Sequence, residues 1–164
     1  MRSVLELLNT SNYTPHQLKA EIISIASGKN PESLSILMKT NILSFGFKYG
    51  IPRDADIIVD MRFITNPYFI PELKNMDGES GAVKQFVLSQ PETEEFLNKF
   101  LALIDYLHPL YQKEGKAYLT IAAGCTGGRH RSVAIARKIF EHLNAKGIGA
   151  GIIHRDIDRD IKEQ

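Results

Sequence analysis

Hydrophobic positions follow two different periods along the chain. Four segments have the short, apolar pattern of buried strands: residues 34–45, 57–59, 117–124 and 148–154. Three segments have the three- and four-residue spacing of helices: residues 14–28, 81–112 (with a break at Pro91) and 131–146. Because strands and helices alternate, we predict an α/β fold, a single domain with a mostly parallel sheet flanked by helices.

Two segments lack this periodicity. Residues 64–80, ITNPYFIPELKNMDGES, form a long loop with two prolines, and long loops in compact domains are often functional. Residues 155–164, RDIDRDIKEQ, carry mixed charge, and we expect them to be a solvated or frayed helix. His154 immediately precedes this tail, and its position favours a solvated strand end.

Composition limits the partners and the compartment. The chain has 20 Lys and Arg against 19 Asp and Glu, so a basic site must be local. One cysteine excludes an internal disulfide and favours a reducing compartment. No apolar stretch is long enough to span a membrane, and the start MRSVLELLNTSNYTP is a poor signal peptide. We therefore expect a cytoplasmic protein without a membrane partner. No metal or cofactor is expected, since no cluster has metal-ligand spacing.

The stretch LTIAAGCTGGRHRSVAIARKIF, residues 119–140, joins a strand to a helix through a glycine-rich basic turn. Ligands of open α/β sheets bind at the carboxyl ends of strands, and a helix N-terminus there attracts anions. Glycines let the backbone wrap closely around a phosphate, and an arginine can donate two hydrogen bonds to it. The predicted phosphate-binding residues are Thr126, Gly127, Gly128, Arg129, His130, Arg131 and Ser132. The alternative is a tight turn whose arginines face water.

A catalytic interpretation of the same turn is also open. Cys125 and Arg131 fit the motif C-x-x-G-x-x-R-S, which resembles the phosphate loop of cysteine-dependent protein tyrosine phosphatases. In that interpretation Cys125 is the nucleophile and Arg131 holds the phosphate oxygens. Gly124 stands where those enzymes usually carry histidine. Nothing singles out a general acid among Asp54, Asp60 and Asp77. A cysteine at a strand end also fits simple core packing.

A more extensive resemblance rests on two blocks, SFGFKYGIPRDADIIVDMRFITNP at 44–67 and GCTGGRHRSVAIA at 124–136. They resemble the carboxy-terminal domain of the RapZ/YvcJ family of bacterial P-loop nucleotide-binding proteins, some of which act as RNase adapters for small RNAs. The upstream string NTSNYTPHQLKAEI is similar to the segment that joins the family's two domains. The resemblance implies a helical lead-in over residues 1–32 and the carboxy-terminal domain over 33–164.

The resemblance also implies a function. The family's Walker A motif, G-x-x-x-x-G-K-[ST], does not occur in this chain, so we expect no nucleotide hydrolysis and no enzyme activity. The family resemblance implies a phosphofructokinase-type fold and a regulatory adapter that senses a phosphorylated sugar such as glucosamine-6-phosphate. It assigns ligand contacts to the basic turn and to Asp60, Arg62 and Asn66. Tyr68 stands where enterobacterial members have histidine, so another sugar phosphate or oxyanion remains open.

The implied partners are RNA or an RNase or other regulatory protein, with the chain as a homo-oligomer. The RNA-binding members end in a basic tail, whereas residues 155–164 here hold three basic and four acidic side chains. Phosphate neutralisation drives RNA affinity, so we expect weak RNA binding. The remaining candidates near SFGFKYG are the basic residues Lys39, Lys48, Arg53 and Arg62 and the aromatic residues Phe45, Phe47 and Tyr49. These aromatics can stack on bases, or they belong to the core or cap the ligand site.

Overall fold

The structure, a computed structural model, describes residues 38–159 together with Leu18 and Ile22. The predicted helix over 14–28 and the lead-in over 1–32 otherwise lie outside the described residues, and Leu18 and Ile22 are both helical. A compact unit begins at Met38.

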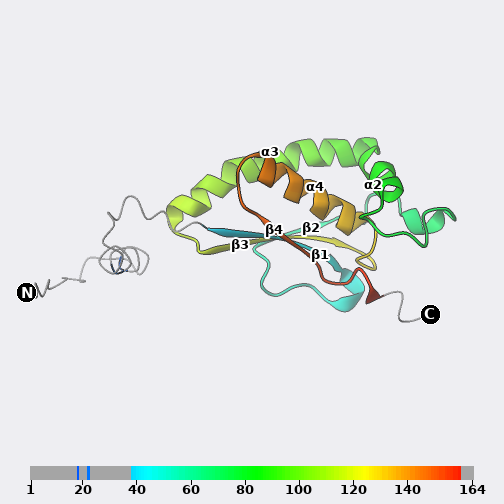
Figure 1. Cartoon of the computed structure of the whole chain (residues 1–164), viewed down its shortest axis with the longest axis horizontal. Coiled ribbons are helices and arrows are strands. Elements are labelled where there is room, and N and C mark those ends of the chain that lie inside the picture. Colours follow the sequence, from blue (N-terminus) through cyan, green and yellow to red (C-terminus); the bar gives the residue numbers. More distant parts are fainter. Residues whose placement is uncertain (1–17, 19–21, 23–37, 160–164) are drawn as a thin grey trace, which may run out of the picture. The chain divides into compact units, whose positions relative to one another are not determined.

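Four parallel strands form one sheet in the order β2-β3-β1-β4 (Figure 1). The strands are β1 (Lys39–Gly46), β2 (Ile57–Asp60), β3 (Tyr118–Cys125) and β4 (Gly151–His154). The α-helices of this part of the chain are α2 (Gly81–Leu88), α3 (Pro91–Glu114) and α4 (Arg131–Ala145). Two 3-10 turns, η2 (Phe47–Tyr49) and η3 (Pro67–Phe69), follow β1 and β2. The predicted α/β fold with a parallel sheet is confirmed.

One predicted strand, β4, is too long at its amino-terminal end, and the start of another, β1, is only partly described. Strand β1 begins at Lys39, and residues 34–37 lie outside the described part of the chain. Strand β4 begins at Gly151 rather than at Ile148, so that prediction is wrong by three residues. The reason is that Ile148 still belongs to the turn that ends α4: its N–H donates to the Leu143 carbonyl at 3.0 Å. A hydrogen bond to the helix end withdraws this residue from the sheet.

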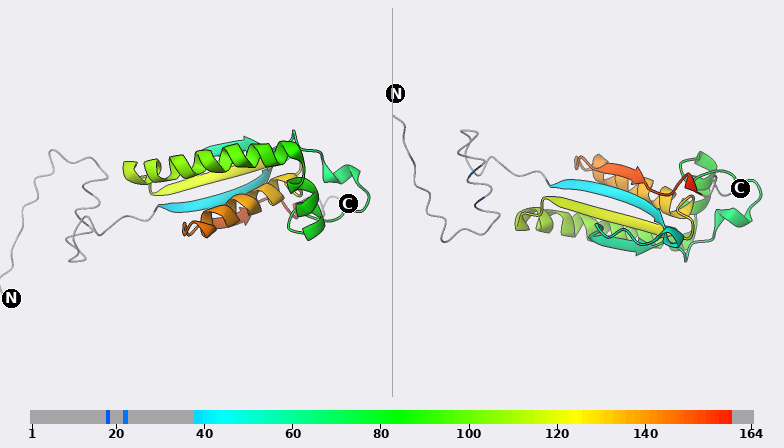
Figure 2. Two further views of the ribbon diagram at one scale, coloured as in Figure 1. Left: turned by 90° about the horizontal axis from the view of Figure 1, so that it is seen from above. Right: turned by 90° about the horizontal axis from the view of Figure 1, so that it is seen from below.

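The helices α3 and α4 lie on the same face of the sheet (Figures 1 and 2). Between sheet and helices lies one hydrophobic core, to which alternate strand residues contribute because side chains alternate across a strand. Its fully buried members include Ile42, Ile104, Leu119, Ile121, Ile135, Ile139 and Leu143. No helix among the described residues is long and apolar enough to cross a membrane.

The register of the sheet aligns three strand ends at one edge. Gly46 of β1 pairs with Cys125 of β3, and Asp60 of β2 pairs with Gly124. The segments that follow these strands therefore meet: η2, the loop over 61–80, and the turn between β3 and α4. This carboxyl edge is where an open α/β sheet places its ligand.

Candidate functional site

The glycines of the β3–α4 turn permit two backbones to pack against each other. A Cβ atom on Gly46 would lie 2.6 Å from the carbonyl carbon of Gly127. A Cβ atom on Gly128 would lie 2.6 Å from the Gly46 nitrogen, and Gly128 has a φ of 77°, which disfavours other residues. The close approach of the β1 end to the turn therefore requires glycine at Gly46 and at Gly128.

The exposed point of the turn is Thr126, followed by the partly exposed Gly127. The Thr126 carbonyl accepts the Lys48 N–H at 3.2 Å, which ties η2 to the turn. Helix α4 then begins at Arg131 with His130 as its N-cap, and no side chain among the described residues caps its amides. An uncapped helix N-terminus has N–H groups available for an anion.

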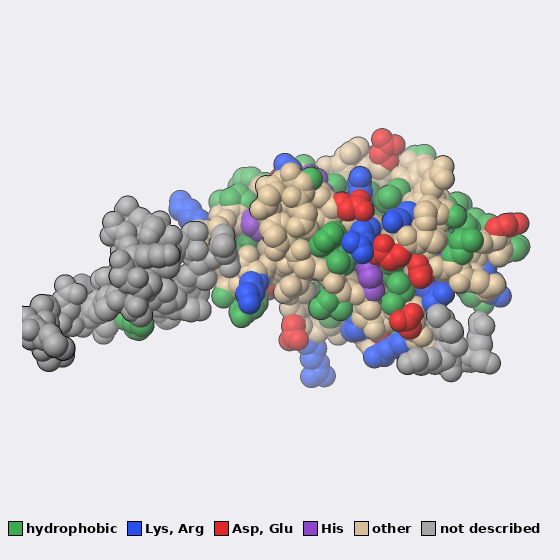
Figure 3. Space-filling view, viewed as in Figure 1, with side chains coloured by type: hydrophobic (Ala, Val, Ile, Leu, Met, Phe, Trp, Pro, Cys, Tyr) green, Lys and Arg blue, Asp and Glu red, His purple; other side chains and the backbone are tan. Residues whose placement is uncertain are grey.

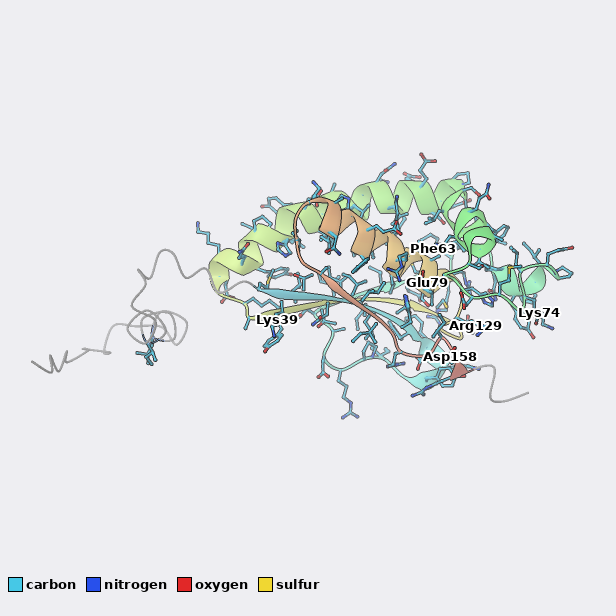
Figure 4. The ribbon with its side chains drawn as sticks, viewed as in Figure 1. Lys39, Phe63, Lys74, Glu79, Arg129 and Asp158 are labelled. Atoms are coloured by element: carbon cyan, nitrogen blue, oxygen red, sulfur yellow. The ribbon has the colours of Figure 1, made fainter. Side chains whose placement is uncertain are left out.

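Two of the three basic side chains of the turn hold neighbouring segments in place. Arg129 donates to the Ile157 carbonyl at 2.9 Å and to the Asn75 carbonyl at 3.0 Å. The buried His130 donates through Nε2 to the Lys74 carbonyl at 3.3 Å. Burial lowers the pKa of His130 below its ordinary value, so the ring is neutral at neutral pH. Figure 4 shows Arg129 at this edge of the domain with Lys74 on the adjacent loop. The partly exposed Arg129 thus binds backbone carbonyls of two other segments, whereas the turn-only alternative has the arginines facing water.

The third basic side chain, Arg131, joins the turn to the segment after β2. It is 5% exposed, and its Nη1 donates to the carbonyls of Arg62 at 3.1 Å and Ile64 at 2.9 Å. Its Nη2 donates to the Thr126 hydroxyl at 3.2 Å. Its buried Nε has no hydrogen-bond partner among the described residues. A buried donor of this kind is costly unless something satisfies it, so Nε is a candidate donor to a ligand. Burial lowers the pKa of Arg131, and Cys125 and Asp60 act in the opposite direction, so the Cys125 thiol also lies close to this guanidinium.

Cys125 is held inside the turn. Its Sγ accepts the Gly128 N–H at 3.2 Å and lies 3.1 Å from the Ser132 Oγ. The residue is only 3% exposed, which gives an incoming phosphoester little access to the sulfur. Two of the three candidate general acids are also engaged: Asp60 pairs with Arg62, and Asp77 accepts the N–H groups of the turn before α2. These contacts favour a packing role for Cys125.

Asp60 and Arg62 form an exposed ion pair at the end of β2. The Arg62 Nη2 and Asp60 Oδ2 atoms are 2.6 Å apart, and the guanidinium lies over the Phe47 ring at 4.2 Å. Hydrogen bonds from Arg62 hold the pKa of Asp60 below its ordinary value, against the opposing effect of burial. The charge of Arg131 acts on Asp60 in the same direction as Arg62. The structure thus brings Asp60, Arg62 and Arg131 together beside Thr126.

Asn66 and Tyr68 lie farther along the same loop and make local contacts. The Asn66 Oδ1 accepts the Tyr68 N–H at 3.4 Å and caps η3. The exposed Tyr68 ring contacts Phe69 edge-on, and the Lys74 ammonium lies 4.8 Å from its centre. Their predicted ligand contacts remain predictions.

One of the three aromatic residues of SFGFKYG belongs to the core, and the other two lie against cationic side chains. Phe45 is fully buried and packs edge-on against Phe47 at 4.8 Å, so it belongs to the core. The Phe47 ring lies beneath Arg62, and Tyr49 lies beside Lys48 and Arg159. For Phe45 the base-stacking alternative is wrong, because Gly124 leaves the space that its ring fills.

Asp156 is fully buried, so the expectation of a solvated tail is wrong at this residue. Its carboxylate is inaccessible, and Oδ2 accepts the Gly46 N–H at 2.8 Å. The same oxygen accepts Arg155 Nε at 2.9 Å and Nη2 at 2.7 Å. Asp156 therefore anchors the end of β1 against the glycine turn. The sequence feature that could have indicated this role is the position of an acidic residue just after β4, at the carboxyl edge of the sheet.

The prediction that His154 is a solvated strand end is wrong. Its Nε2 donates to Glu79 Oε1 at 2.8 Å, and its Nδ1 lies 2.8 Å from the buried Ser44 hydroxyl. Arg137 of α4 donates to the same Glu79 carboxylate at 2.7 Å. This network links β1, β4 and α4 to the end of the 61–80 loop. These segments are far apart in the sequence, so the contacts between them could not be predicted from the sequence alone.

The Glu79 network predicts a pH dependence of stability. Burial raises the pKa of Glu79, but the hydrogen bonds from Arg137 and His154 outweigh it, so the pKa lies below the ordinary value of 4.5. A depressed pKa gives stability that is present above that ordinary value and is lost as the pH falls through the folded-state pKa. We expect Glu79→Gln to lower the free energy of unfolding by about 1 kcal/mol at pH 7 and to flatten its fall between about pH 5 and pH 3.

Urea unfolding at a series of pH values measures this effect. Glu95→Gln is the matched control, since Glu95 pairs with Lys99 in full exposure to water and its loss should leave stability nearly unchanged. Equal pH profiles for wild type and Glu79→Gln would show that the network does not stabilise the fold.

The family model of the RapZ C-terminal domain matches residues 38–158 of this chain. The chain belongs to the RapZ C-terminal domain family. The matched range contains every strand and α-helix of the described unit and the whole candidate site. The RapZ resemblance predicted from the two sequence blocks is confirmed.

Similar proteins carry the name "nucleotide-binding protein". One from Desulforapulum autotrophicum is 63% identical over 157 residues, covering 96% of this chain and 53% of that protein. One from Ruminiclostridium cellulolyticum is 48% identical over 157 residues, covering 95% of this chain and 53% of that protein. One from Caldicellulosiruptor saccharolyticus is 46% identical over 156 residues, covering 95% of this chain and 52% of that protein. The RapZ C-terminal domain described here thus spans about half the length of these relatives.

Proposed function

We propose that this RapZ C-terminal domain binds a phosphorylated small molecule, without catalysis, at the turn from Thr126 to Ser132. The observation that carries the proposal is the uncapped N-terminus of α4 beside the buried, unpartnered Nε of Arg131. Both offer N–H donors at one turn, and a phosphate accepts several such hydrogen bonds at once. A sugar phosphate such as glucosamine-6-phosphate is the proposed ligand, since Thr126, Asn66 and Tyr68 can meet sugar hydroxyls.

The proposed role is that of a sensor in a regulatory adapter. Arg131 connects Thr126 with the carbonyls of Arg62 and Ile64, so a ligand on the turn would act on the 61–80 loop. A loop that responds to ligand can change the surface seen by a protein or RNA partner. We propose a homo-oligomer as the acting form, because several copies increase the avidity for one partner.

RNA is the weaker of the proposed partners. Figure 3 shows acidic and basic side chains interspersed on one face of the domain rather than separated by sign. Arg155 and Arg159 both pair with buried Asp156, which leaves less charge to neutralise phosphates. The isolated domain is therefore proposed to bind RNA only at the weak end of non-specific affinity, about 10⁻⁴ M at physiological salt.

Thermal unfolding with glucosamine-6-phosphate, glucosamine and inorganic phosphate tests the proposed ligand class. Because a ligand of the native state raises stability by mass action, a sugar phosphate at about 100 times its dissociation constant adds about 2.7 kcal/mol. We expect glucosamine-6-phosphate to raise the unfolding temperature and unphosphorylated glucosamine to leave it unchanged. Equal effects of the two sugars would contradict a phosphate site.

The variant Cys125→Ser separates a binding domain from a phosphatase. In the proposed function the thiol only packs, so the dissociation constant of this variant for the sugar phosphate should lie within about threefold of the wild-type value. The corresponding difference in binding free energy is well under about 1.4 kcal/mol. The wild type should not hydrolyse an aryl phosphate. Hydrolysis by the wild type that Cys125→Ser abolishes would establish the cysteine phosphatase instead.

A further inference from the structure

The Asp60–Arg62 pair has the geometry of an arginine bound to an oxyanion. Arg62 donates Nε to Oδ1 at 2.9 Å and to Oδ2 at 2.9 Å, and Nη2 to Oδ2 at 2.6 Å. The Arg62 backbone N–H adds a fourth hydrogen bond to Oδ1 at 2.9 Å. A carboxylate and a phosphate present similar pairs of oxygens to a guanidinium, so Asp60 occupies the donors that a phosphate would use.

This pair lies against the candidate site. The Arg62 guanidinium covers Phe47, and the next residue, Lys48, donates its N–H to the Thr126 carbonyl. The Arg62 carbonyl accepts Arg131, whose other end holds the Thr126 hydroxyl. The charge of Arg131 also acts on Asp60. Thus Asp60 contacts one guanidinium group and is influenced by the charge of a second, at the edge of the turn proposed to take a phosphate.

Exposure makes the contact reversible. The side chains of Arg62 and Asp60 are 51% and 44% exposed, and exposed ion pairs are worth little because water competes for both charges. A dianionic phosphate held by the turn amides can therefore take Arg62 from Asp60. Asp56 at the other end of β2 differs, because it also accepts the Thr120 N–H at 2.8 Å and pairs with Lys116 on the amino-terminal side of β3.

We propose that Asp60 is an internal competitor for the phosphate-binding site: it occupies Arg62 in the ligand-free domain and thereby sets the affinity for phosphorylated ligands. This inference rests on the proposed function and adds to it. Asp60 is then not a ligand contact but the group that the ligand displaces. An apparent dissociation constant rises when only a fraction of the protein is in the competent form, here the form with Arg62 released.

Phosphate titration of four proteins tests the inference: wild type, Asp60→Asn, Arg62→Ala and the double variant. Inorganic phosphate is the probe, and calorimetry at low ionic strength is the measurement. We expect Asp60→Asn to bind phosphate about two- to fivefold more tightly, the range that an exposed pair allows. The gain should shrink with added salt, which screens exposed charges. It should vanish in the double variant, which should bind as Arg62→Ala does.

Asp56→Asn is the control for a general loss of negative charge, and it should leave phosphate affinity unchanged. Weaker or equal binding by Asp60→Asn, with wild type binding phosphate, would overturn the competitor role and leave the proposed function standing. A gain that persists without Arg62 would also overturn it. Absence of phosphate binding in wild type and in Asp60→Asn alike would overturn the proposed function, and the competitor role with it.

Discussion

Substitution of Gly128 by alanine is expected to lower the free energy of unfolding by about 2–5 kcal/mol. The left-handed φ of 77° costs a non-glycine residue about 1–2 kcal/mol. The new methyl group would also lie 2.6 Å from the Gly46 nitrogen and 2.9 Å from Asp156 Cβ, and overpacking of this kind costs about 1–3 kcal/mol. Because backbone atoms form one side of this contact, the turn cannot relax by rotating a side chain.

Gly147→Ala is the matched control for this experiment. Gly147 has nearly the same φ, 79°, but nothing lies within 4 Å of its added Cβ. Its substitution should cost only the conformational part, about 1–2 kcal/mol. Urea unfolding of both variants measures the difference. Equal losses would mean that the packing of the turn against β1 contributes nothing to stability.

Substitution of Arg131 by lysine is expected to cost about 2–4 kcal/mol of stability and most of the phosphate affinity. One ammonium cannot donate at once to the carbonyls of Arg62 and Ile64 and to the Thr126 hydroxyl. Each buried acceptor left without a donor costs about 1–3 kcal/mol. The proposed phosphate contact through Nε is lost in addition, which should weaken binding at least about tenfold.

Arg137→Lys on the same helix is the control for this variant. Arg137 pairs with Glu79 at the surface of the domain, and the change should cost less than about 1 kcal/mol. Urea unfolding gives the stability of both variants, and calorimetry with inorganic phosphate gives the binding. If Arg131→Lys were as stable as Arg137→Lys, the role of Arg131 in holding the 61–65 segment would be contradicted.

The predicted fold follows from patterns that lie within single segments. The apolar runs of β2 and β3 and the spacing of α4 are local, and a parallel sheet then places the turn after β3 at the carboxyl edge. The start of β4 was mispredicted because Ile148 is apolar like a strand residue, yet bonds to the end of α4. Hydrophobicity alone does not distinguish these two surroundings.

The side-chain contacts of the site were harder to predict. Arg129, His130 and Arg131 were expected to face a phosphate or water, but each donates to at least one carbonyl group of another segment. Any residue supplies a carbonyl, so the sequence carries no sign of such a partner. Asp156 and Gly46 are 110 positions apart and meet only because β4 pairs with β1. A long-range pairing of this kind is set by topology rather than by a local motif.

The most direct test of the oxyanion site is a titration of the isotopically labelled protein with inorganic phosphate, followed by amide and guanidinium N–H resonances. The Arg131 Nε–H and the backbone N–H groups of residues 126–132, except that of Gly128, which donates to the Cys125 Sγ, should shift together with one dissociation constant, because each would donate to the same anion. Saturable shifts confined to these groups would support the account. Shifts that avoid them, or no saturation at millimolar phosphate, would contradict it.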